Sequence, residues 1–200
     1  MRPHFLAGLP RRLRLARADA DLARACAGDA RQCGLVFDKH GPAMLRFAHW
    51  VAGQRELAND VVQDIFVQML EQRLSYSPAL GEERSFLLTV TRRKLISALR
   101  LPSAVVHADA DDATPAGDIP DDGACDPMAQ LVRAREAGFV STVLKALPYA
   151  HREVLVLREF EGCSYEEIAA LVQVPIGTVR SRILRARKSF LAHYLSHTGE

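Results

Sequence analysis

The stretch "CSYEEIAALVQVPIGTVRSRILRARKSF", residues 163–190, carries the clearest structural signal in this sequence. Ser164 precedes a short apolar run and Glu167 follows three residues later, which is the capping-box signature of a helix start. "QVP", residues 173–175, predicts a turn, and a longer basic segment begins at Ile176. A short capped helix, a tight turn and a longer basic helix together predict a helix-turn-helix unit.

The longer segment has an apolar face and a cationic face when it is placed on a helical wheel at about 100° per residue. The apolar stripe consists of Ile176, Val179, Ile183, Ala186 and Phe190. The outer half of the wheel and its shoulders hold Thr178, Arg180, Ser181, Arg182, Leu184, Arg185, Arg187 and Lys188. No acid lies among these residues, whereas a merely solvated helix usually mixes charges to form i,i+4 pairs. We therefore expect a DNA-binding face; a solvated or protein-binding face is the alternative.

The N-terminal half of a recognition helix normally meets base edges in the major groove. Arginine suits this place because its guanidinium forms two hydrogen bonds with guanine O6 and N7, or clamps a phosphate. The residues expected near the bases are Thr178, Arg180, Ser181, Arg182 and Arg185. Leu184 either touches a thymine methyl group or is simply exposed, and Arg187 and Lys188 are expected at phosphates.

The chain as a whole predicts an all-α protein with two small helical domains joined by a flexible acidic linker. Residues 102–127 form this linker, since they hold seven aspartates, four prolines and two glycines but no Lys or Arg. Residues 19–101 and 128–196 are helical in pattern and form the two domains, and residues 1–18 form a basic, disordered N-terminal extension. Such segregation of charge suggests a highly charged partner.

Six helices are expected outside the helix-turn-helix unit, at residues 22–27, 35–51, 54–73, 84–100, 128–147 and 149–160. The "HGP" motif, residues 40–42, predicts a kink or break in the second of them. In the 54–73 helix, Val62, Ile65, Phe66, Met69 and Leu70 form one apolar stripe. We read this stripe as the core face.

The sequence contains no motif for catalysis, cofactor binding or a metal site, so we expect neither an enzyme nor a cofactor. His193 and His197 are four residues apart, but no third ligand is evident near them. The four cysteines form no CxxC pair, which favours a reduced, cytoplasmic protein. No apolar run approaches about 18 residues, so we expect no membrane insertion.

Three segments resemble those of extracytoplasmic function (ECF) sigma factors, in the order that this family has them. Residues 146–190 resemble the minus-35-reading domain (sigma region 4), and residues 57–70 resemble the helix that docks on the β′ clamp of RNA polymerase. "SFLLTVTRRKLISALR", residues 85–100, resembles the following helix of sigma region 2, which captures the minus-10 element. The resemblance covers about residues 30–195 and implies a subunit that directs promoter recognition, DNA melting and transcription initiation.

The resemblance also implies partners: core RNA polymerase through its β′ clamp and β flap, promoter DNA, and an anti-sigma factor. On the docking helix, the polar face of Asp60, Gln63 and Asp64 is expected at the clamp, with Phe66 or Val67 adding an apolar contact. The pattern of residues alone favours an ordinary solvated face here.

The residues expected at the minus-10 element are Phe86, Arg92, Arg93, Lys94, Ser97 and Arg100. Many relatives carry Asn at the position of Arg93 and Asp at the position of Ser97, so the preferred sequence is expected to differ. Arg93 is expected near a captured base, and the other cations at phosphates. A solvated basic face is the alternative.

Two other functions remain open at this point. A stand-alone helix-turn-helix regulator would need no docking helix, and an adaptor of anti-sigma type would not need the cationic face. Co-purification with core polymerase separates these possibilities.

Overall fold

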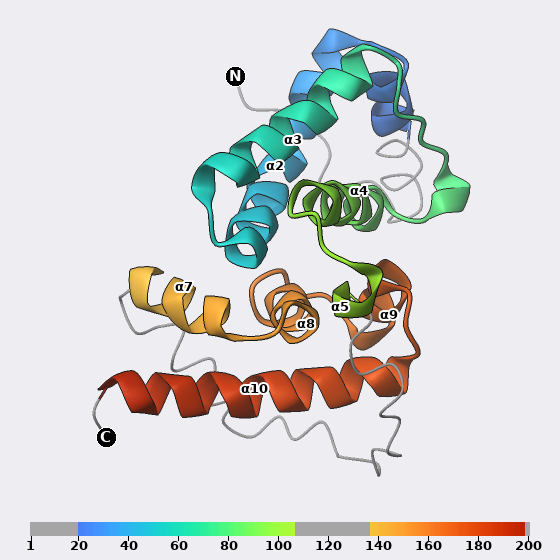
Figure 1. Cartoon of the computed structure of the whole chain (residues 1–200). Helices are drawn as coiled ribbons and strands as arrows, with labels where there is room; N and C mark the ends of the chain where they lie inside the picture. The colour runs from blue at the N-terminus through green and yellow to red at the C-terminus, as the bar shows by residue number, and fades with distance from the viewer. Residues whose placement is uncertain (1–19, 107–136, 199–200) are drawn as a thin grey trace, which may run out of the picture.

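The computed structural model describes residues 20–106 and 137–198, and within these ranges every regular element is helical, as predicted. Figure 1 shows two layers of helices that lie against each other. The N-terminal domain contains a first helix at residues 20–26 followed by α2 (Ala30–Ala52), α3 (Arg55–Leu70), the short 3-10 helix η2 (Pro78–Leu80) and α4 (Glu83–Ala98). The C-terminal domain contains α7 (Ala137–Ala146), α8 (Tyr149–Glu159), α9 (Tyr165–Val172) and α10 (Ile176–Thr198).

Helix α2 is longer than predicted and is not interrupted. Asp29 caps its start by accepting hydrogen bonds from the backbone of residues 31 and 32, and Gly53 ends it in the left-handed region at φ 68°. Pro42 lies inside the helix without breaking it. Its ring is exposed, whereas the neighbouring Met44 and Phe47 are 1% and 0% exposed in the core, so packing on the other side keeps the helix continuous.

The core of the N-terminal domain lies where α2, α3 and α4 meet. Most of the predicted stripe of α3 faces this core, with Val62, Ile65 and Met69 at most 1% exposed. Leu70, the last member of the predicted stripe, is instead 44% exposed, because it lies at the end of α3 where the packing against the neighbouring helices stops. Helix α4 contributes Leu87 and Leu95, both fully buried.

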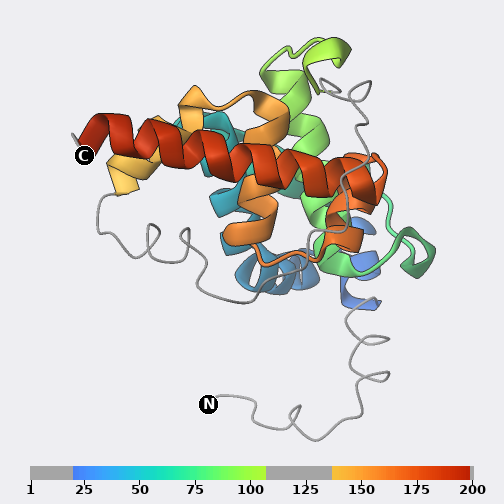
Figure 2. The same ribbon diagram turned by 90° about the horizontal axis from the view of Figure 1, so that it is seen from below.

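The C-terminal domain is organised around α10, which runs along the whole layer beneath α7, α8 and α9 (Figures 1 and 2). The predicted capping box is present: Ser164 Oγ accepts from the Glu167 backbone at 3.1 Å, and the Glu167 carboxylate accepts from the Ser164 backbone at 2.7 Å. Gln173 adopts the left-handed conformation at φ 59° and makes the turn into α10. The apolar stripe from Val179 to Phe190 is buried, as expected.

The linker is only partly within the described residues. Ser103–Val106, which we expected to belong to it, form the short helix α5, and this helix lies against α8 with Val106 4% exposed. The rest of the predicted linker, the N-terminal extension and residues 128–136 of the predicted 128–147 helix lie outside the described residues.

Candidate nucleic-acid interface

The predicted DNA-binding face of α10 is largely accessible. Arg180 and Lys188 are exposed, and the partly exposed residues are Thr178, Ser181, Leu184, Arg185 and Arg187. Ser181 donates its hydroxyl hydrogen to the Thr178 carbonyl at 2.9 Å. The guanidinium of Arg187 donates to Glu159 of α8 at 2.7 and 3.1 Å, so a phosphate contact by Arg187 would compete with that carboxylate.

Arg182 does not belong to this face in the structure, which corrects our expectation. Its side chain is 0% exposed. On the helical wheel it lies at the edge of the apolar stripe, and α10 packs on α8, which carries the fully buried Glu153. The positive charge of Arg182 is among the interactions that stabilise the Glu153 carboxylate. A buried acid of this kind requires nearby cations, and Arg182 is one of them.

Tyr165, at the first position of α9, is a residue that the sequence did not single out. The guanidinium of Arg158 lies 4.7 Å from the centre of its ring, and that of Arg180 lies 6.0 Å away. Cation–π contacts of this kind orient a guanidinium at modest gain. Tyr165 therefore helps to hold Arg180 at the N-terminal end of α10.

The residues predicted for the docking surface on α3 differ in their exposure to solvent. Asp60 and Gln63 are exposed, and Val67 is 39% exposed. Phe66 is only 8% exposed, because its ring packs edge-on against Phe37 of α2 with the centroids 5.1 Å apart. Phe66 therefore lies beneath this surface and supports it, and the exposed apolar side chain is that of the neighbouring Val67.

A depression lies beside these side chains. It has a volume of about 300 Å³ and is lined by Phe37, Leu45, Asn59, Val62, Gln63 and Phe66. The sequence did not predict Phe37 as part of this surface, because it comes from another helix.

Asp64 of the docking helix and Lys94 of the minus-10 helix contact each other. Lys94 Nζ donates to the Asp64 carboxylate at 2.6 Å, and the Gln68 amide donates to it at 3.0 Å. The hydrogen bond from Lys94 is the main reason why the pKa of Asp64 is lowered. We expected Asp64 at the polymerase clamp and Lys94 at a phosphate of the minus-10 element. In this structure the two side chains form an ion pair with each other.

The minus-10 helix, α4, presents part of the predicted set to solvent. Arg93, Ser97 and Arg100 are exposed. Phe86 is partly buried against Tyr76, with the ring centroids 4.9 Å apart, and the Tyr76 hydroxyl donates to the Gly81 carbonyl at 2.8 Å. The aromatic pair therefore lies near the start of α4, and the exposed cations lie further along the chain.

Arg92, which we expected at a phosphate, is 6% exposed in this arrangement and points into the C-terminal domain. Its Nε donates to Glu153 Oε1 at 2.7 Å. The Tyr149 hydroxyl donates to the same oxygen at 3.0 Å. Burial raises the pKa of Glu153, although Arg92 opposes the shift. In this arrangement Arg92 cannot reach a phosphate.

The described ranges, residues 20–106 and 137–198, hold neither a metal-binding cluster nor a helix suited to a membrane. No group of three or more His, Cys, Asp or Glu side chains there is placed to hold a metal ion. None of the helices in these ranges combines the length and apolar character needed to cross a membrane.

Two family models match the chain. "Sigma-70 region 2" matches residues 36–101 and "Sigma-70, region 4" matches residues 140–190. The first range covers most of the N-terminal domain and the second covers most of the C-terminal domain.

Curated relatives agree with the family models. An ECF RNA polymerase sigma factor, SigE of Mycolicibacterium smegmatis, is 30% identical over 81% of this chain and 61% of its own length. The RNA polymerase sigma-H factor of Pseudomonas aeruginosa is 48% identical over 32% of this chain and 33% of its own length. The chain thus spans about three fifths of the first relative and one third of the second.

Two solved structures are similar. CnrH, in complex with the cytosolic domain of CnrY, matches with a TM-score of 0.60 and 25% identity over 88% of this chain and 95% of that chain. The sigma factor RpoE of Bartonella quintana, in complex with the anti-sigma factor NepR, shares the fold, with a TM-score of 0.54 and 24% identity over 76% of this chain and 89% of that chain. Both family models, the relatives and the fold lead to one conclusion: the chain belongs to the sigma-70 family, as a factor of ECF type.

Proposed function

We propose that this chain is an alternative sigma factor that binds core RNA polymerase and directs promoter recognition, DNA melting and transcription initiation. The observation that carries the proposal is the pairing of sigma-70 regions 2 and 4, in that order, on two helical domains. A helix-turn-helix unit alone occurs in many regulators. The additional region 2 supplies the docking helix that such a regulator does not need, which is why a stand-alone regulator is not favoured.

Each domain has a distinct part in the proposed function. Exposed Asp60, Gln63 and Val67 on α3 meet the β′ clamp, and the C-terminal domain meets the β flap. The accessible face of α10 reads the minus-35 duplex, with Arg180 and Arg185 at base edges or phosphates.

The minus-10 element is held on α4 as a single strand. Arg93 and Arg100 supply exposed positive charge, and Phe86, near the start of α4, supplies a ring on which a base can stack. Holding unstacked bases offsets the cost of taking them out of the duplex, so binding energy alone opens the DNA. The chain needs no catalytic group of its own for this step, and we propose that it is not an enzyme.

Two further parts of the proposal concern the location of the protein and a regulatory partner. We place the protein in the cytoplasm, where its polymerase is, and we propose an anti-sigma factor as a partner. The similar RpoE structure is a complex with the anti-sigma factor NepR, which supports a partner of this class.

The test combines co-purification with core polymerase and run-off transcription from a promoter library. Asp60→Lys should weaken core binding by about tenfold or more, because it places a cation on the acidic polar face, and it should leave the melting temperature unchanged. Asp38→Lys is the matched control, since Asp38 is an exposed acid of α2 outside the residues assigned to this surface. Tight binding of duplex promoter by the free protein, with no recruitment of core enzyme, would instead identify a stand-alone regulator.

A further inference from the structure

Three arginines of the N-terminal domain meet two glutamates of the C-terminal domain where the two layers touch. We call Arg46 of α2 together with Arg84 and Arg92 of α4 the arginine cluster. Its partners are Glu161, which follows α8, and Glu153 within α8. All three arginines therefore have acidic partners that are distant in sequence.

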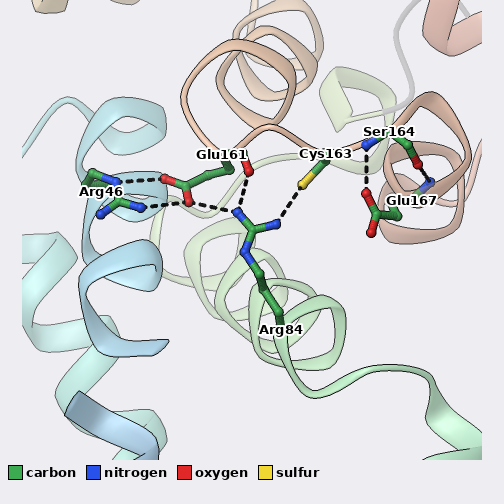
Figure 3. A network of polar contacts seen from close by, with 6 residues as sticks. All are labelled: Arg46, Arg84, Glu161, Cys163, Ser164 and Glu167. Atoms are coloured by element: carbon green, nitrogen blue, oxygen red, sulfur yellow. Dashed lines mark hydrogen bonds and ion pairs between the residues drawn. The ribbon is translucent and has the colours of Figure 1, made fainter. Parts of the chain in front are cut away.

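Glu161 receives two of the arginines, as Figure 3 shows. Arg46 donates through Nε and Nη2 to its two carboxylate oxygens at 3.2 and 3.1 Å, which is a side-on, bidentate pair. Arg84 donates to the carboxylate at 3.1 Å and also to the Glu161 carbonyl, while its other nitrogen lies 3.6 Å from Cys163 Sγ. The Glu161 side chain is 0% exposed, so in this closed arrangement its charge is covered by the N-terminal domain.

Glu153 receives the third arginine at 2.7 Å, and this contact is incomplete. Arg92 Nη2 and Glu153 Oε2 are both buried, and neither has a hydrogen-bond partner among the described residues. A buried polar group left unsatisfied reduces the gain from the contact. The pair is thus poorly optimised as a permanent part of the core.

The closed arrangement conflicts with the proposed function. The resemblance implies minus-10 and minus-35 elements about 17 base pairs apart, or roughly 58 Å of duplex. The Arg92–Glu153 contact brings the minus-10 helix within hydrogen-bonding distance of the domain that reads minus-35. The two domains must separate before both elements can be bound, and separation takes the acids away from the arginine cluster.

The geometry points to a nucleic-acid surface beneath this interface, an inference that rests on the proposed function. We propose that the arginine cluster binds promoter phosphates in the open form, and that Glu153 and Glu161 cover it in the closed form in the place of phosphates. The guanidinium fork that clasps Glu161 matches a phosphate equally well. The cluster adjoins the minus-10 helix, since two of its members lie on α4.

A built-in reporter makes the opening measurable. The single tryptophan of the chain, Trp50, packs against Phe160 across the same interface, with the ring centroids 5.1 Å apart. Separation of the domains exposes the indole and shifts its emission to longer wavelength. Both Glu161→Gln and the double variant Arg46→Gln/Arg84→Gln should produce this shift, because each removes one side of the same ion pairs.

DNA binding then separates the two classes of variant. The probe is a fluorescein-labelled forked DNA duplex, titrated with the full chain at several salt concentrations. Glu161→Gln should bind it about tenfold more tightly than the wild type, because opening no longer costs the ion pairs. Adding Arg46→Gln and Arg84→Gln to Glu161→Gln should remove the gain and lower the slope of log Kd against log salt by about 1.8, or 0.9 for each lost phosphate contact.

A control variant and the partial exposure of the two replaced arginines make the test specific to the arginine cluster. Arg31→Gln, at an exposed arginine of α2 without a role in the cluster, should leave emission and salt slope unchanged. Arg46 and Arg84 have side chains 52% and 37% exposed, so their replacement should preserve the fold even if a glutamate variant does not. An equal salt slope with and without the two arginines would overturn the proposal, as would unchanged Trp50 emission in both classes of variant.

Run-off transcription by the wild type with core polymerase addresses the proposed function separately. Absence of transcripts, together with the expected salt slopes, would refute the sigma-factor function and leave the phosphate-binding surface in place. Normal transcripts with an unchanged slope would refute the phosphate-binding surface alone.

Discussion

Replacing Arg182 by alanine is expected to destabilise the C-terminal domain and to leave promoter preference unchanged. Among the described residues, Arg182 is the largest side chain that is fully buried. Its charge contributes to stabilising Glu153, which is also 0% exposed. The truncation therefore removes a cation from a buried charged group and leaves a cavity in the contact between α8 and α10.

The expected cost follows from these two losses. Truncating a large, fully buried side chain to alanine typically costs about 2–5 kcal/mol. Glu153 keeps Arg92 at 2.7 Å and Tyr149 at 3.0 Å, so we expect a value of about 3 kcal/mol. For a domain of this size, that corresponds to a melting temperature lower by roughly 10 °C or more. Arg182→Met, which fills the space with an apolar chain of similar length, should recover part of the loss.

Thermal unfolding followed by circular dichroism measures the stability, and run-off transcription from a library of minus-35 sequences measures the preference. Arg180→Ala is the matched control, two residues earlier on the same helix and exposed. It should leave the melting temperature unchanged and reduce minus-35-dependent transcription by roughly tenfold. If Arg182→Ala melted like the wild type and altered the minus-35 preference, the burial argument would be refuted.

Three further predictions concern a cap, an acid and a thiol. Ser164→Ala removes the capping box of α9 and should cost about 1 kcal/mol, measured as a melting temperature lower by several degrees. Glu83 is buried, which alone would raise its pKa, but hydrogen bonds from His40 and Lys39 lower it below 4.5. Its stabilising contribution is therefore complete above pH 4.5 and is lost as the pH falls through the lower, folded-state value. Urea titrations at decreasing pH should show this loss, and Glu83→Gln should flatten it. Burial raises the pKa of Cys26 to about 11, so iodoacetamide at pH 8 should label it slowly in the native protein and quickly in urea; fast native labelling, located by peptide mapping, would contradict this.

Local features of this chain were predictable from the sequence because their causes are local. The capping box joins Ser164 and Glu167 within one turn, and the buried stripe of α10 follows from its spacing. The effect of Pro42 was not predictable in the same way. Whether a proline breaks a helix depends on what the opposite face packs against, and here that face is the core formed with α3 and α4.

The roles of the buried arginines could not be assigned from periodicity. Arg92 and Arg182 both approach Glu153, which lies on a third helix, α8. One signal was available: Glu153 precedes the unbroken apolar run of residues 154–157. An acid at such a position is buried, and a buried acid needs cations from other elements. The packing of the two domains against each other was not readable from the sequence either.

The chemistry of the domain interface suits a contact that has to be broken. A buried ion pair adds little net stability, because desolvation of both charges offsets most of their attraction. An apolar interface of similar size would lose its stabilisation when opening exposes it to water, and no new contacts would replace the lost ones. Arginines released from Glu153 and Glu161 gain phosphates instead. Because Arg46 and Arg84 are partly exposed, salt should weaken their pairs with Glu161 before it affects the buried pair of Arg92, so opening should begin at Glu161.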